Sequence, residues 1–194
     1  MDKALRTVLI PIGAGAPLVD RVRSEFFSDS AILYTAGDSG EDLAAILVAA
    51  ATLFGESLRT CVPLRGGIGH GRFQMDPDKR LFMGESLVEA YRIGEDAQWL
   101  GIVLGKAVTE ACQQTSLSKY VVTWSIPHEN GVAVPCSVLD WPNVFADSLK
   151  KPPIALAEFY QPFERLSGSY ADLPPKVKRK YENTVAFMNA RLSR

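Results

Sequence analysis

Phe26-Phe27-Ser28-Asp29-Ser30-Ala31-Ile32-Leu33-Tyr34 decides the fold of the first part of the chain, because two apolar runs flank a short polar stretch. Each apolar run predicts a β-strand. Ser and Asp are favoured in tight turns, since their side chains bond to nearby backbone groups. The stretch therefore predicts a β-hairpin with Asp29 at its bend.

The residues that follow the hairpin predict further helices and strands. Acidic residues within 38–42 stand where a helix would begin, and apolar residues recur at three- and four-residue spacing as far as Leu58. The glycine-rich run Leu64-Arg65-Gly66-Gly67-Ile68-Gly69-His70-Gly71 lies within a predicted strand over 62–73. A turn over 76–79, a strand over 80–83 and a helix over 84–96 complete this part, with Leu87, Val88 and Tyr91 on one face of that helix.

The remaining elements are a short strand at 8–10, a strand over 100–104, a helix over 106–114, a strand over 120–124 and a final helix ending near Leu192. The segment 135–175 is rich in proline and turn residues, so we expect an ordered but irregular covering segment. Its aromatic residues can pack against the core: Trp141, Phe145, Phe159, Tyr160 and Phe163.

Composition indicates one soluble domain over 1–194, with a core over about 5–126 and covering elements over about 127–194. The chain has 194 residues, 47% of them hydrophobic and 22% charged, and a formal net charge of −1. This charge gives no driving force for binding nucleic acid or a membrane. The three cysteines lie far apart without metal-site spacing, and no apolar run is long enough to span a membrane, so we expect a cytoplasmic protein.

Taken together, the F-S-D-S, R-G-G-I and A-Y strings resemble the catalytic core of the class III nucleotidyl cyclases, most closely its divergent bacterial members. The resemblance covers Glu25 to Val108 and resumes in shorter strings after Tyr120. It implies an α+β, ferredoxin-like sandwich with helices on one face of a mainly antiparallel sheet and C-terminal decoration. It also implies a homodimer in which Arg92 of one subunit approaches Asp29 of the other.

The resemblance assigns roles to particular residues. Asp29 matches a metal-binding aspartate at a hairpin bend, for Mg²⁺ or Mn²⁺ if the protein is active, and Arg92 matches the catalytic arginine that stabilises the transferring phosphate. A nucleoside triphosphate would contact Arg65, Gly66 and Gly67, with Glu25 at the position of the family's base-selecting lysine.

Other positions depart from the family pattern. Val88 replaces an asparagine of the catalytic helix, and Leu81 replaces a base-selecting aspartate. Residues 8–13 contain no carboxylate where the family's first strand has its other metal ligand. One aspartate cannot by itself hold two metal ions for nucleotidyl transfer.

Simpler interpretations of the same residues remain open. Asp29 could serve only the turn, and Arg92 could be an ordinary solvated residue. Arg65 in an apolar strand needs a partner such as Asp29 or Glu89, or a bound anion. His70 is expected to be structural, and His128, just before a turn, is expected to be exposed.

Three hypotheses for the function follow. The first is a degenerate cyclase homology domain that binds a nucleotide or a partner domain with little or no cyclisation. The second is an active divergent cyclase, for which a pyrimidine nucleotide is one candidate substrate. The third is a structural module that only dimerises.

Overall fold

The computed structural model describes residues 20–27, 29–76, 79, 81–128, 130–149 and 151–193, and shows a mixed α/β protein. The predicted strand at 8–10 lies outside the described residues. The strands are β1 (Val22–Phe27), β2 (Ser30–Thr35), β3 (Gly66–Ile68), β4 (Phe73–Asp76), β5 (Leu81–Gly84), β6 (Ile102–Leu104), β7 (Val121–Pro127) and β8 (Ala133–Leu139). The longer helices are α3 (Gly40–Arg59), α4 (Glu85–Asp96), α5 (Lys106–Gln113) and α9 (Pro175–Leu192).

Short helical segments connect and cover these elements. They are η2 (Ser116–Tyr120), α6 (Trp141–Val144), η3 (Ala146–Ser148), α7 (Leu156–Tyr160), η4 (Gln161–Phe163), α8 (Glu164–Ser167) and η5 (Tyr170–Asp172).

The described strands form three separate sheets. The largest has the order β3-β6-β8-β7, in which β3 and β6 are parallel and the other pairs antiparallel. The hairpins β1–β2 and β4–β5 form two further sheets of two strands each. The prediction of an α+β fold with mainly antiparallel pairing is therefore confirmed in this coarser form.

The predicted helices form where expected, and their ends follow from local sequence. Ser39 caps α3: its hydroxyl accepts from the backbone N–H of Asp42, and the Asp42 side chain accepts from the N–H of Ser39. The Ser39 hydroxyl also donates to the Asp42 carboxylate at 2.6 Å, and this bond is the main cause that lowers the pKa of Asp42; the bond from Arg21 adds to the lowering, while burial opposes it. The Arg21 guanidinium also pairs with Glu41, so the start of β1 is tied to the first turn of α3.

Two predicted elements differ from the structure. The strand expected over 62–73 shortens to β3, and Phe73 instead begins β4 after Gly71, whose φ is 150°. The segment expected to be irregular from 135 contains most of β8, which pairs along its whole length with β7. Pro135 is tolerated there because β6 pairs with β8 only at Ser137 and Val138, so this part of β8 has a free edge.

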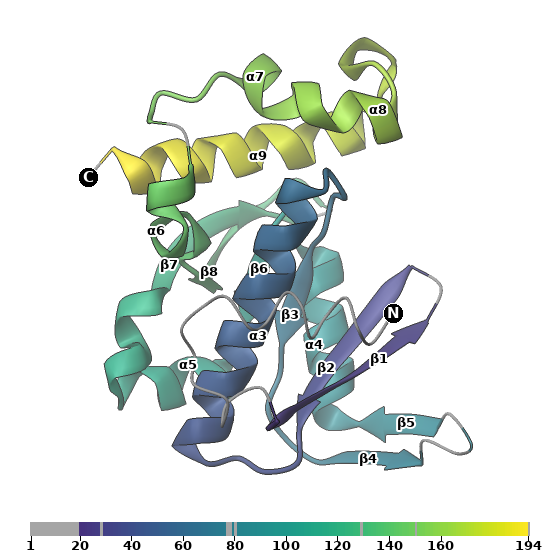
Figure 1. Ribbon diagram of the computed structural model, residues 1–194, viewed down its shortest axis with the longest axis vertical. Coiled ribbons are helices and arrows are strands. Elements are labelled where there is room, and N and C mark those ends of the chain that lie inside the picture. The colour runs from purple at the N-terminus through teal and green to yellow at the C-terminus, as the bar shows by residue number, and fades with distance from the viewer. Residues whose placement is uncertain are drawn as a thin grey trace.

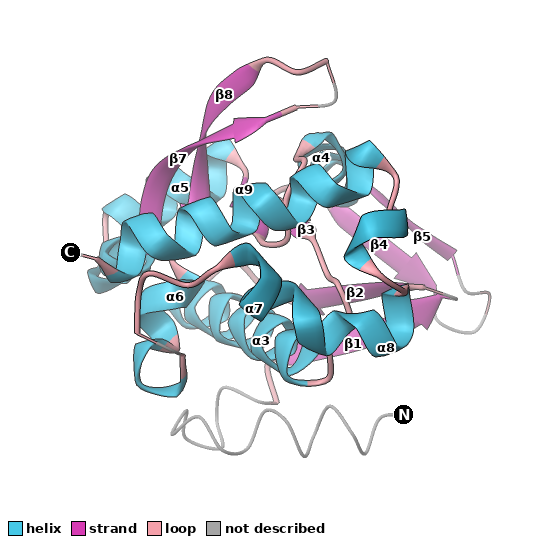
Figure 2. Ribbon diagram, turned by 90° about the horizontal axis from the view of Figure 1, so that it is seen from above, coloured by secondary structure: helices cyan, strands magenta, loops and turns pink. Residues whose placement is uncertain are grey.

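Within a core that is largely aliphatic, a cluster of aromatic rings packs the C-terminal helix against the large sheet. Phe187 of α9 contacts Trp99, Trp124 and Trp141, with ring centroids 5.0, 5.2 and 6.1 Å away. Trp99, Trp141 and Phe187 are fully buried. A second cluster, Tyr160, Phe163 and Tyr181, packs α7 and η4 onto α9. Both views show α7 lying alongside α9 (Figures 1 and 2), so the covering segment is packed as predicted.

Polar side chains fix α9 in this position. Arg191 makes two hydrogen bonds to the Asp140 carboxylate, at 3.1 and 2.7 Å, and Asp140 is only 2% exposed. Thr184, which is 0% exposed, accepts from the Leu100 N–H at 2.8 Å. The Asn189 amide bonds both the N–H and the carbonyl of Ile154. The bonds from Thr184 and Asn189 satisfy backbone groups of Leu100 and Ile154 that pack against α9.

Candidate functional site

The β1–β2 hairpin presents Asp29 at its bend, as predicted. Phe27 pairs with Ser30 across the hairpin, and Asp29 lies in the turn between the two strands. Asp29 is exposed, and the Ser30 hydroxyl donates to its carboxylate at 3.3 Å. Glu25 lies on β1 opposite Ile32 and is half-buried. The carboxylate proposed to bind metal is thus at the surface of the molecule.

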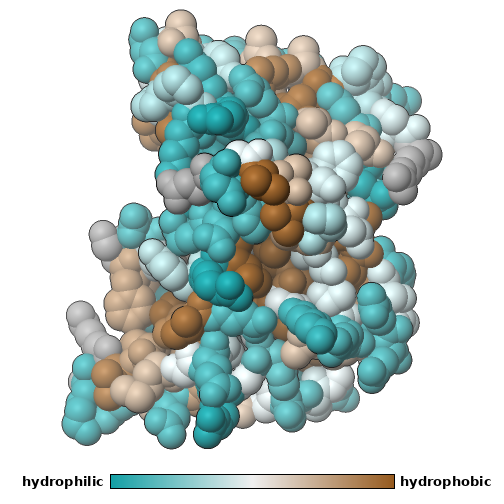
Figure 3. All heavy atoms as spheres, turned by 180° about the vertical axis from the view of Figure 1, so that it is seen from behind, coloured by the Kyte–Doolittle hydropathy of each residue, from teal (hydrophilic) through white to brown (hydrophobic). Residues whose placement is uncertain are grey.

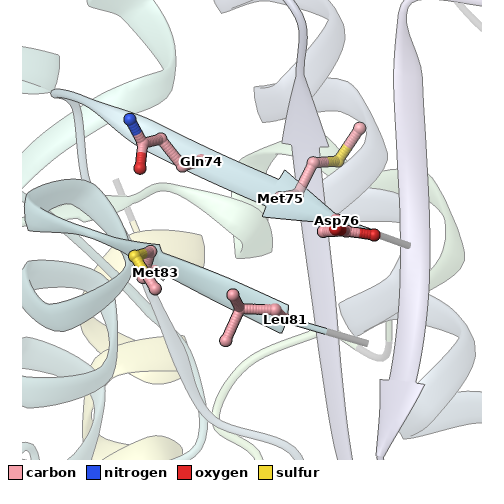
Figure 4. A pocket seen from close by; sticks show the side chains of 5 residues that line it. All are labelled: Gln74, Met75, Asp76, Leu81 and Met83. Carbon is pink, nitrogen blue, oxygen red and sulfur yellow. The ribbon is translucent and has the colours of Figure 1, made fainter. Parts of the chain in front are cut away.

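Aromatic side chains join this hairpin to the β4–β5 hairpin. The Phe27 and Phe82 rings meet edge to face with centroids 5.2 Å apart, and Tyr34 lies 5.2 Å from Phe73. A hollow of about 350 Å³ opens on the second hairpin. Figure 4 shows its lining side chains on the two adjacent strands: Gln74, Met75 and Asp76 from β4, and Leu81 and Met83 from β5.

Arg65 has a structural partner, but neither of the two carboxylates expected. Its guanidinium donates to the Glu95 carboxylate at 2.5 Å and to the backbone oxygens of Glu95 and Ala97 at 2.7 and 3.2 Å. The Arg65 side chain is 20% exposed. Glu95 and Ala97 lie at the C-terminal end of α4, where carbonyl groups lack intrahelical partners and favour a cation. The ion-pair interpretation of Arg65 is correct, with Glu95 in place of Asp29 or Glu89.

The two glycines after Arg65 lie against α4 and differ in what surrounds them. A Cβ on Gly67 would lie 2.3 Å from the Ala90 carbonyl oxygen and 2.4 Å from an Ile93 side-chain carbon. A Cβ on Gly66 would have no neighbour within 4 Å. From the helix side, a Cβ on Gly94 would lie 2.8 Å from the carbonyl carbon of Gly66. The backbone therefore approaches closely at these glycines, and what it approaches is helix α4.

Arg92 lies on α4, exposed, and lines a hollow of about 560 Å³ between α4, α5, β6 and β8. Charged groups of both signs surround this hollow: Glu89, Arg92 and Asp96 from α4, and Lys106 and Glu110 from α5. Arg65, Gly66 and Gly67 thus meet the helix that carries Arg92. Asp29 and Glu25 belong to a different sheet.

The first turns of α4 carry apolar side chains that face solvent. Val88 is 65% exposed and Tyr91 69%, and on the neighbouring hairpin Leu81 is 48% and Met83 46% exposed. We call these four residues the α4–β5 apolar surface. Exposed apolar groups that lie together are typical of interaction sites. The predicted amphipathic pattern of this helix did not reveal that one apolar face remains uncovered.

Sequence reasoning also missed a contact between Cys136 and His128, whose Sγ and Nε2 atoms are 3.8 Å apart. Both residues line the hollow beside Arg92. His128 was expected to be exposed but is half-buried. Its backbone forms an isolated antiparallel β-bridge with Ala97, at the end of α4. His70 is exposed, and its backbone N–H donates to the Glu89 carboxylate at 3.2 Å.

On the face opposite to the viewer of Figure 1, apolar side chains gather in the middle and polar ones surround them (Figure 3). Among the described residues, groups of three or more His, Cys, Asp or Glu side chains arranged to hold a metal ion are absent. Within the same residues, no helix has both the length and the apolar content to cross a membrane.

No family model matches the chain, and comparisons with curated proteins and with solved structures find no match either.

Proposed function

We propose that this chain is a degenerate class III nucleotidyl cyclase homology domain that binds a nucleotide and performs little or no cyclisation. The order of elements supports the kinship: a hairpin with an aspartate at its bend, a long helix, a glycine strand, a second hairpin and a helix with an arginine. A common fold does not by itself establish activity, so the argument rests on individual residues.

The observation that carries the proposal is the engagement of Arg65. Its guanidinium already bonds one carboxylate and two backbone carbonyls at the end of α4. Turning it toward a phosphate would break the ion pair with Glu95 and remove the donor from the two backbone oxygens. Gly67 similarly accommodates the Ala90 carbonyl. Two of the residues expected to hold a triphosphate therefore stabilise the protein instead.

Arg92 remains available for an anionic ligand. It is exposed at the edge of the larger hollow, and the acidic residues beside it, Glu89 and Asp96, keep the local charge from being strongly positive. A single arginine in this setting favours weak binding of a phosphate group. We therefore expect nucleotide affinity to depend on Arg92 and to be modest.

The first test measures turnover and binding separately. The full chain is incubated with each of ATP, GTP, CTP and UTP in the presence of Mg²⁺ or Mn²⁺, and cyclic nucleotides are quantified by mass spectrometry. Nucleotide binding is measured by titration calorimetry for the wild type, for Arg92→Ala and for Arg179→Ala, an exposed arginine of α9 that serves as a charge-matched control.

We expect no sustained product, weak binding by the wild type and by Arg179→Ala, and weaker binding by Arg92→Ala. Robust cyclic nucleotide production that Asp29→Ala abolishes would overturn the proposal and support an active divergent cyclase. Equal nucleotide affinity of the two arginine variants would mean that Arg92 does not contribute to nucleotide binding.

A dimerisation module is the second candidate, and the α4–β5 apolar surface favours it. Val88 and Tyr91 on one helix, beside Leu81 and Met83 on one hairpin, form a surface that a second copy of the chain could cover. Sedimentation equilibrium tests this by comparing Tyr91→Glu with Val132→Asp, since Val132 is an exposed apolar residue in the β7–β8 connection. A dimer that only Tyr91→Glu dissociates, together with no nucleotide binding, would favour this candidate.

A further inference from the structure

The three cysteines of the chain lie in three different environments. Cys112 on α5 is 0% exposed. Cys61 follows α3, is half-buried and has a φ of 62°. Cys136 on β8 is also half-buried, but it lines the hollow beside Arg92 and its Sγ lies 3.8 Å from the Nε2 of His128. Among the thiols of the described residues, Cys136 is the one that contacts a histidine, and it lines a concave surface large enough for a small molecule.

A thiol reacts as the thiolate, so its reactivity depends on where its proton goes. Burial raises the pKa of Cys136, as it does for Cys112, so the thiol carries its proton at neutral pH. In the tautomer that carries its hydrogen on Nδ1, the Nε2 of His128 can accept that proton at the observed separation of 3.8 Å. Cysteine beside histidine is an arrangement that activates a thiol as a nucleophile.

The charged groups around the hollow indicate which reagent it would accept. Arg92 and Lys106 offer positive charge, and Glu89, Asp96 and Glu110 offer negative charge. Lys106 and Glu110 lie 3.8 Å apart and form an ion pair along α5. Groups of both signs around one hollow suit a ligand that carries carboxylates and an ammonium group together.

We propose that Cys136 is a thiol–disulfide exchange site, assisted by His128, that takes a small zwitterionic disulfide into this hollow. His128 Nε2 accepts the Cys136 proton, and the Sγ electron pair forms a bond to one sulfur of the disulfide. The original S–S bond breaks, its electron pair leaves with the second sulfur, and that sulfur takes the proton. The products are a mixed disulfide at Cys136 and one free thiol. This inference does not depend on the proposed function.

The test uses the full, reduced chain with oxidised glutathione as the probe. Adduct formation at each cysteine is followed over time by peptide mass spectrometry. Four proteins are compared: the wild type, Cys136→Ser, His128→Ala and His70→Ala. His70 is an exposed histidine outside the hollow and serves as the matched control. The buried Cys112 reports unfolding, because it becomes reactive only when the core opens.

We expect the first adduct at Cys136, ahead of Cys61, with Cys112 unmodified. His128→Ala should slow the Cys136 reaction at least about tenfold, since a positioned base contributes 10² or more to proton transfer, while His70→Ala should leave it unchanged. If His128→Ala exposes Cys112, His128→Gln replaces it. Reaction of Cys61 as fast as Cys136, no adduct at all, or equal slowing by both histidine variants would overturn the proposal.

Discussion

Gly67→Ala tests whether the glycine strand serves packing. The new Cβ would lie 2.3 Å from the Ala90 carbonyl oxygen and 2.4 Å from an Ile93 carbon, so helix α4 must move by about 1 Å to restore ordinary contact. Overpacking of this kind costs about 1–3 kcal/mol and sometimes more. Replacing glycine also restricts the unfolded chain, which offsets about 0.4–1 kcal/mol. We expect a net loss of about 1–2 kcal/mol in the free energy of unfolding.

Gly66→Ala is the matched control, because its Cβ meets no atom within 4 Å and its φ is not positive. We expect it to be neutral or to stabilise by up to about 1 kcal/mol. Urea unfolding followed by tryptophan fluorescence measures both variants, since Trp99 and Trp141 are fully buried. For a chain of this size, a loss of about 1–2 kcal/mol lowers Tm by roughly 2–8 °C. Equal stability of the two variants would refute the packing argument.

Three further predictions concern the C-terminal helix and are measured in the same way or by titration. Arg191→Met should lower the free energy of unfolding by about 3–5 kcal/mol, since Asp140 would remain as a buried carboxylate without its cation. Adding Asp140→Asn to the same chain should recover part of this loss. Thr184→Val should cost about 1–3 kcal/mol, because the Leu100 N–H loses its acceptor, whereas Thr184→Ser keeps it. Burial and the hydrogen bond to Glu182 raise the pKa of Tyr170 to about 12. The contribution of Tyr170 to the free energy of unfolding is therefore complete below pH 10 and is lost as the pH rises toward 12. In Tyr170→Phe, the free energy of unfolding should fall less between pH 10 and 12 than in the wild type.

Local sequence predicted the elements well because their signals are local. The cap at Ser39, the spacing of apolar residues along α3 and the polar bend at Asp29 depend on residues within a few positions of each other. The last helix was predicted from its apolar repeat, and α9 indeed buries Tyr181, Val185 and Met188.

Pairing across the chain was harder to predict. Pro135 suggested an irregular segment, because proline cannot donate a hydrogen bond within a sheet. The structure accommodates it in β8 because β6 does not pair with β8 at this position. That pairing could not be predicted locally, since β6 lies more than thirty residues earlier in the chain. The pairing of Arg65 with Glu95 was also hard to predict, because it depends on how distant segments pack together. Several carboxylates were available in the sequence, and only the direction of α4 over β3 decides which of them is reached.

The candidate site shows how one motif can satisfy two physical requirements. The R-G-G-I string suggested phosphate binding, since a glycine backbone and an arginine suit an anion. In this fold the same properties accommodate α4: Gly67 leaves space for the Ala90 carbonyl, and Arg65 bonds the carbonyls at the end of that helix. The string alone therefore does not distinguish a nucleotide-binding site from a site of close helix–strand packing.

Arg92 provides the distinction, because it is exposed and lines the larger hollow. If nucleotide binding is lost in Arg92→Ala while the free energy of unfolding is unchanged, the ligand contacts α4 from its solvent side. Loss of binding only in Gly67→Ala, in proportion to its loss of stability, would instead mean that the glycine strand acts through the position of the helix. These two results separate recognition of a ligand from support of the fold, which the shared motif combines.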